Sequence, residues 1–162
     1  MKKLFALVFD LSYVEIKWLD DTAVQTIISG STLTNNNREA AAYNNSTELD
    51  MYADFELFVK FDTTAPSAGD RVAELFILPT VDGTNFPEGG DGTVGDDLDP
   101  QQVLKIGVFE SRDPSTSTEE RIVLSGIPLP PRDARYVIKN ISGQTMNASW
   151  TLKAKPYKLQ SV

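Results

Sequence analysis

The sequence predicts an all-β protein, an antiparallel β-sandwich or jelly roll of about eight strands. Three observations support this fold class: apolar residues mostly recur with a period of two, turn residues separate the apolar runs, and only one short segment has helical character. The chain has 162 residues, the size of one domain with its own core. Residues 31–162 are predicted to form the sandwich. Residues 1–30 are predicted to be a strand or arm region that packs on it or extends from it.

The N-terminal region contains the first predicted strands. Lys2 and Lys3 precede six apolar residues, 4–9, which imitates the start of a signal peptide. The run is too short, however, and Asp10 ends it without a small-residue cleavage site, so we expect a strand there. Weaker strand candidates follow at 12–18 and 24–29. The segment 37–43, rich in alanine, is the one helical candidate, and it is too short to be stable alone.

The clearest alternation lies between residues 54 and 62. Phe55, Leu57, Val59 and Phe61 fall on one face of a strand, whereas Phe58 falls on the opposite face, among charged residues. Similar patterns predict the remaining strands, over residues 72–78, 103–109, 120–125, 134–140 and 150–155. Trp150 alternates in phase with Leu152 and Ala154, so we expect it in the core.

Turn residues separate these strands. Gly83 and Gly143 supply positions that tolerate positive φ, and prolines mark strand ends. The segment 79–102 holds five glycines and six acidic residues, and it predicts a long Gly/Asp-rich loop that leaves the sandwich.

The composition excludes several kinds of chemistry. The chain has no His and no Cys, which rules out catalytic triads based on them, thiolate chemistry, disulfides and imidazole or thiolate zinc sites. The formal charge of -8 argues against binding to nucleic acid or to an anionic membrane. On composition alone the chain therefore reads as a binding or structural domain without cofactor, and not as an enzyme.

Three features leave room for a role that is not purely structural. The acidic loop could hold calcium, but its carboxylates lack the spacing of an EF-hand loop, so we expect a solvated loop. Carboxylate pairs could act in glycoside hydrolysis, but Asp50 with Asp54 and Glu119 with Glu120 are no more than chance would give among 23 acids. Trp18, Trp150 and five tyrosines could form a platform for carbohydrate, but the phase of both tryptophans with apolar neighbours predicts that they point inward; this binding role stays open as an alternative.

The charge is unevenly distributed along the chain. Residues 1–100 carry 18 acidic and 6 basic side chains, whereas residues 101–162 carry 5 acidic and 9 basic ones. A folded domain can mix the two halves in space, or it can present one basic face to an acidic neighbour. The stiff segment 128–131, Pro-Leu-Pro-Pro, is either a rigid corner or a preorganised contact surface.

Several strings in the sequence resemble a family of small structural proteins of tailed bacteriophages. They include Asp54-Phe-Glu-Leu and the stretch from Glu74 to Gly89, which contains Leu-Pro-Thr-Val-Asp-Gly-Thr-Asn-Phe. Arg121 to Pro131, with Gly-Ile-Pro-Leu-Pro-Pro, and Tyr136 to Thr145 follow in the same order, so the resemblance covers roughly residues 47–158.

This resemblance implies a virion protein, most specifically a jelly-roll capsid decoration (cement) protein. It would be made in the host cytoplasm and bound to the outer surface of the capsid, with the major capsid protein and copies of itself, as a homotrimer, for partners. The family implies no catalytic residues. The alternatives are a tail or fibre component and a carbohydrate-binding adhesin. The expected interface residues are Phe86, Pro128, Leu129, Pro130, Pro131, Arg135, Lys139, Lys153, Lys155 and Lys158.

Overall fold

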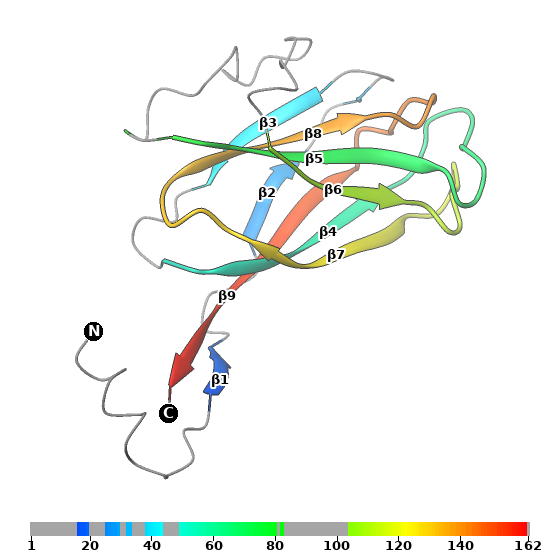
Figure 1. The fold of residues 1–162 in the computed structure, drawn as a ribbon. Helices are drawn as coiled ribbons and strands as arrows, with labels where there is room; N and C mark the ends of the chain where they lie inside the picture. The colour runs from blue at the N-terminus through cyan, green and yellow to red at the C-terminus, as the bar shows by residue number, and fades with distance from the viewer. Residues whose placement is uncertain are drawn as a thin grey trace.

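The computed structural model of the chain is an all-β sandwich of nine strands (Figure 1). It describes residues 16–19, 25–29, 32–33, 38–43, 49–80, 82 and 104–161. The strands are β1 (Ile16–Leu19), β2 (Gln25–Ser29), β3 (Arg38–Tyr43), β4 (Tyr52–Val59), β5 (Arg71–Pro79), β6 (Leu104–Glu110), β7 (Glu120–Pro128), β8 (Ala134–Asn140) and β9 (Thr151–Ser161). Among these residues there is no helix, and hence none that is long and apolar enough to cross a membrane.

The strands form two antiparallel sheets with the pairing of a jelly roll. One, called the β4 sheet here, has the order β1-β9-β4-β7, and β2 also pairs with β9; the other, called the β5 sheet, has the order β3-β8-β5-β6. The pairs β5–β6, β4–β7, β3–β8 and β2–β9 are therefore nested one inside the next along the chain. This nesting of eight strands over two sheets defines the jelly roll, so the predicted fold class is confirmed.

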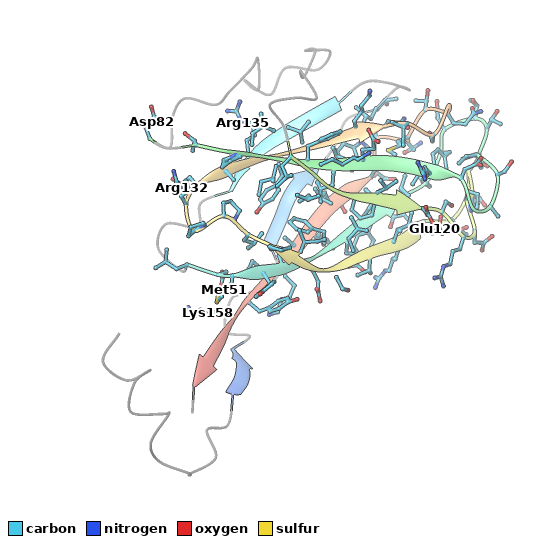
Figure 2. The ribbon with its side chains drawn as sticks, viewed as in Figure 1. Met51, Asp82, Glu120, Arg132, Arg135 and Lys158 are labelled. Atoms are coloured by element: carbon cyan, nitrogen blue, oxygen red, sulfur yellow. The ribbon has the colours of Figure 1, made fainter. Side chains whose placement is uncertain are left out.

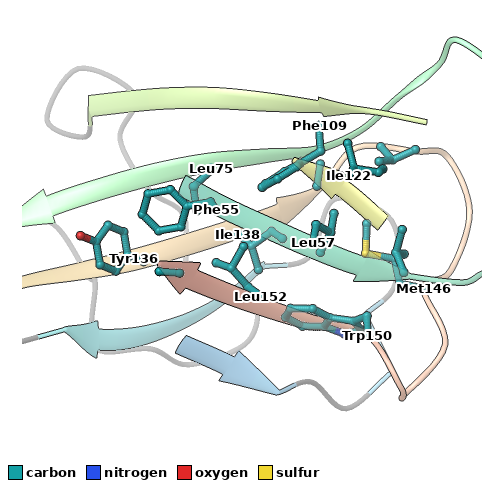
Figure 3. Close-up of a cluster of buried hydrophobic side chains, with 14 of the residues drawn as sticks. Phe55, Leu57, Leu75, Phe109, Ile122, Tyr136, Ile138, Met146, Trp150 and Leu152 are labelled. Carbon is teal, nitrogen blue, oxygen red and sulfur yellow. The ribbon is translucent and has the colours of Figure 1, made fainter. Parts of the chain in front are cut away.

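The core lies between the two sheets and contains the residues that the period-two pattern places inward (Figure 3). Phe55 and Leu57 of the β4 sheet face Leu75 and Tyr136 of the β5 sheet. The ring centroids of Phe55 and Tyr136 lie 5.1 Å apart. Trp150, directly before β9, is fully buried, as its phase with Leu152 predicted. Since the chain has no disulfide, this apolar core is the main source of its stability.

One buried polar side chain connects the loop after β8 to the segment before β3. Asn140 is completely buried, and its amide donates hydrogen bonds to the carbonyls of Leu33 (2.8 Å) and Gln144 (2.7 Å). Its oxygen accepts bonds from the backbone N–H (2.9 Å) and hydroxyl (2.7 Å) of Ser142. All the hydrogen-bonding capacity of this amide is thus used inside the protein.

The prediction of a short helix over 37–43 is wrong. Residues 38–43 form β3, and all six pair antiparallel with β8, from Arg38 opposite Lys139 to Tyr43 opposite Ala134. Alanine favours a helix, but a helix of two turns is unstable alone, whereas the strand gains a full ladder of hydrogen bonds to a buried neighbour. The sheet therefore overrides the local preference.

The other strands lie close to their predicted positions. Those predicted over 72–78, 103–109 and 134–140 are found within one residue of these bounds, and the last strand continues from Thr151 to Ser161. The predicted strand 4–9 and nearly all of the predicted loop 79–102 lie outside the described residues. The final residues of β9 pair only with β1, and Figure 1 shows this two-stranded ribbon extending beyond the two layers.

Candidate functional site

The basic residues expected at an interface lie on two different faces. Arg135 and Lys139 are on β8 and alternate with the core residues of the β5 sheet, so they belong to its outer face. Lys153 and Lys155 alternate with core residues of β9 and belong to the outer face of the β4 sheet. Lys158 pairs in register with Leu19 on the protruding ribbon. The fold thus does not gather these residues into one basic face.

The proline-rich segment is a corner of the sandwich. Leu129 is 9% exposed and packs in the core, and its backbone N–H donates to the carbonyl of Met51 at 2.9 Å. The backbone turn directs its side chain inward, and the interface role expected for Leu129 stays a prediction. Pro128 and Pro131 are exposed and Pro130 is half-buried, all at the end of the sandwich where Figure 2 shows Met51. Phe86 lies outside the described residues.

The outer face of the β4 sheet carries an aromatic ring between cations. Phe58 is only 8% exposed although it lies on this polar face. The guanidinium carbon of Arg121 is 4.6 Å and the Lys153 ammonium 4.2 Å from the ring centroid. Arg121 also approaches Glu56, at 4.0 Å. Each cation–π contact at such a site contributes about 0.5–1 kcal/mol, and the long side chains shield the ring from water.

This cluster was not predicted from the sequence. Phe58 was the signal, since an aromatic residue on the polar side of an amphipathic strand needs a partner. The register supplies the partners, because Phe58 is opposite Arg121 on β7 and Glu56 is opposite Lys153 on β9. A small hollow of about 200 Å³ lies next to the cluster on the same face, lined by Asp54, Phe55, Glu56, Val123, Lys153, Ala154 and Lys155.

A second cluster on this face is centred on Asp54. One of its carboxylate oxygens accepts hydrogen bonds from the Gly126 N–H (2.8 Å) and from the Tyr157 hydroxyl (3.2 Å). Gly126 lies in the bulge of β7 at φ +70°, a backbone conformation that favours glycine. Burial raises the pKa of Tyr157 above its usual range, and the charge and hydrogen bond of Asp54 raise it further. The ring of Tyr52 stacks on Tyr157, with centroids 6.0 Å apart.

A groove of about 870 Å³ runs between the edges of the two sheets. Val108 of β6 lies on one side, and Ile122 and Leu124 of β7 lie on the other. The two sheets approach each other closely at Gly107, where a Cβ atom would lie 2.3 Å from the tip of Leu124. Only glycine leaves room there for the Leu124 side chain in its present position.

Glu120 fixes the loop at one end of the groove (Figure 2). Its carboxylate accepts a short hydrogen bond from the hydroxyl of Ser111, which is fully buried, and bonds from the backbone N–H groups of Arg112 (2.6 Å) and Asp113 (3.0 Å). These bonds hold the residues that connect β6 to β7. Glu120 therefore holds this loop in position.

No group of three or more potential metal ligands is found among the residues that the structure describes. Asp91, Asp96, Asp97 and Asp99, the residues considered as calcium ligands, lie outside that part of the chain. The described surfaces carry cations, aromatic rings and prolines, and β6 and β7 end their sheets.

No family model and no curated protein matches the sequence. Two solved structures of infectious bursal disease virus show a slight likeness, with a TM-score of 0.31 and 13% identity for the Gt strain and of 0.34 and 12% for the Gx strain. The match covers 90% and 91% of this chain but only 32% and 37% of the viral chains, so this chain spans about a third of their length.

Proposed function

We propose that this chain is a structural protein of a tailed-bacteriophage virion, a capsid decoration protein that binds the assembled head shell. The proposal rests above all on the nested pairing of eight strands. This pairing is that of a jelly roll, a fold used by viral capsid proteins and by lectins. The resemblance of residues 47–158 to small phage structural proteins favours the first of these classes. A chain without His and Cys also suits a role that depends on surfaces alone.

The function of such a protein is thermodynamic. A protein that binds the assembled shell and not its separated subunits shifts the equilibrium toward the shell by mass action. At a free concentration 100 times the dissociation constant, each occupied site adds about 2.7 kcal/mol. The partners in this proposal are the major capsid protein and further copies of this chain in a homotrimer, on the outer surface of a virion assembled in the host cytoplasm.

The number of copies per particle tests this role directly. Quantitative mass spectrometry of purified particles should give a large, fixed ratio of this chain to the major capsid protein. Heads that lack the protein should bind it to saturation and then break at a higher temperature. A few copies per particle would instead indicate a tail or fibre component, and saturated binding with no gain in heat resistance would refute the stabilising role.

Two charge-reversal variants test which face meets the shell. R135E/K139E changes the outer face of the β5 sheet, and K153E/K155E changes that of the β4 sheet by the same charge. Each variant is the control for the other. We expect one variant to occupy fewer sites on the head, with an occupancy that no longer depends on salt concentration. The other variant should keep the occupancy and the salt dependence of the parent protein. If neither variant changes occupancy, an electrostatic contact through these residues is refuted.

The carbohydrate-binding alternative finds no favourable observation among the described side chains. Trp150 is fully buried, so its ring is unavailable to a sugar. Tyr52 and Tyr157 stack on each other with their planes 18° apart, which covers one face of each ring. Quenching of tryptophan fluorescence by a host polysaccharide would nevertheless favour this class over the one proposed.

A further inference from the structure

Three of the four exposed large apolar residues that the structure describes lie toward one end of the sandwich. Leu49 and Met51, 53% and 46% exposed, come just before β4. Leu104, 63% exposed, begins β6 beside the last residues of β5. Because Tyr52 pairs with Pro128, the residues before β4 lie next to the proline-rich corner. This end of the molecule therefore offers an apolar contact surface.

The backbone holds Leu49 and Met51 in fixed positions. Asp50 between them is buried, the Met51 N–H donates to the carbonyl of Tyr157 (3.1 Å), and the Met51 carbonyl accepts from the Leu129 N–H (2.9 Å). Leu49 has φ +54°, a left-handed conformation that favours glycine and is unfavourable for leucine. Strain of this kind is concentrated at binding sites. Since the Leu49 side chain is exposed, packing in the core does not explain its strain.

The loops at the opposite end of the sandwich are polar. They comprise residues 62–70, 111–119 and 142–149, are rich in serine and threonine, and contain none of the exposed large apolar residues. Figure 2 shows Glu120 next to these loops and Met51 at the other end. An exposed apolar surface on one side of a soluble protein is typical of a contact with a partner. The two ends thus differ as they would in a chain that docks by one end and leaves the other in water.

We propose that the protein docks on the head shell through an apolar corner formed by Leu49, Met51, Pro128, Pro131 and Arg132. The proposal depends on the virion role and names the surface that serves it. The shell subunit presents an apolar surface to the leucine, methionine and proline side chains. It presents a carboxylate to Arg132, which is exposed beside Pro131. Because the prolines and the Met51 backbone are already fixed, docking orders few further groups.

The small size of the apolar corner favours the shell over a second free copy as its partner. A stable interface uses about 20–30 residues on each side. The apolar corner is far smaller, so two free copies would hold together only weakly through it. On a shell, the corners of one proposed trimer bind at the same time, and linked contacts hold far more tightly than one contact alone.

Two matched variants test the apolar corner on purified heads that lack the protein. Leu49→Asp adds a charge within the corner, and Val123→Asp adds the same charge on the outer face of the β4 sheet; both residues are 53% exposed. We expect Leu49→Asp to require at least about tenfold more protein for half occupancy, and Val123→Asp to match the parent. If the parent binds and Leu49→Asp matches it, or if Val123→Asp is weakened as much, the docking surface is wrong while the virion role stands. A parent protein that does not bind the heads would overturn both.

A glycine variant separates binding from folding. Leu49→Gly removes the side chain but suits the positive φ, so its midpoint in urea should equal or exceed that of the parent while its binding to heads weakens. If Leu49→Gly binds as tightly as the parent, the proposal is overturned, even where the aspartate variant fails to fold. Sedimentation tests the second copy as partner. A parent oligomer that dissociates in Leu49→Gly would show that the corner joins copies, and the proposal would be wrong.

Discussion

Gly107 allows a sharp test of how closely the two sheets approach. Substitution Gly107→Ala places a Cβ atom 2.3 Å from Leu124 Cδ1, far inside van der Waals contact, and 3.4 Å from Leu124 Cγ. The contact is with the end of a partly buried side chain, so Leu124 can turn away at some cost to its packing. Overpacking of this kind typically costs about 1–3 kcal/mol, and a flexible partner favours the lower half of that range.

A second effect of the same substitution has the opposite sign. Replacing glycine by alanine at a position without positive φ stabilises a protein by about 0.4–1 kcal/mol, because the unfolded chain loses conformational freedom. The net expectation for G107A in the parent protein is therefore a loss of about 1 kcal/mol. In the L124A background the clash is absent, so the same substitution should become stabilising by about 0.4–1 kcal/mol.

The measurement is a double-mutant cycle from urea unfolding of the four proteins, each substitution referred to its own background. A change of about 1 kcal/mol moves the melting temperature of a chain of this size by about 2–4 °C, which is readily resolved. If G107A has the same effect in both backgrounds to within about 0.5 kcal/mol, the two positions are not coupled and the close approach is refuted.

Three further predictions concern polar groups. Glu120→Gln weakens three hydrogen bonds to the connection between β6 and β7, so trypsin should cut after Arg112 faster than in the parent; an unchanged cutting rate would show that the carboxylate does not fix the loop. Asn140→Ala leaves buried carbonyl and N–H groups without partners and should cost about 1–3 kcal/mol in urea unfolding, and a loss below about 0.5 kcal/mol would contradict the hydrogen bonds described. The pKa of Tyr157 is raised on folding, so the neutral phenol stabilises the protein fully below about pH 10, and this contribution is lost as the pH rises through the folded pKa. Tyr157→Phe should therefore flatten the fall of stability above about pH 10, and an identical slope in both proteins would exclude this linkage.

Local pattern was sufficient to predict most of the sandwich but not β3. The alternation in β4 and the apolar run in β5 are visible within a few residues, because each of these strands buries one face in the core. In β3 the alanines favour a helix, and the strand is stabilised by β8, where Lys139 pairs with Arg38 from 101 positions away. No short window of sequence contains that partner.

The same long-range register determines the surfaces. Composition predicted that the last third of the chain is basic, but it could not separate Arg135 and Lys139 from Lys153 and Lys155. The topology places β8 and β9 in different sheets, and their outward residues therefore lie on different faces. The contacts of Phe58 with Arg121 and Lys153 depend equally on cross-strand register, which the sequence does not reveal.

The nested strand pairing also determines the order in which the chain can fold during synthesis. Gln25 of β2 pairs with Ala154 of β9, so β2 lacks its partner until 129 further residues have been added. At ribosomal speeds of roughly 5–20 residues per second, this delay is on the order of ten seconds. The inner pairs β5–β6 and β4–β7 are complete earlier, and once formed they shorten the loops that the outer pairs must close. β2 thus leaves the ribosome early and is among the last of the described strands to join the fold.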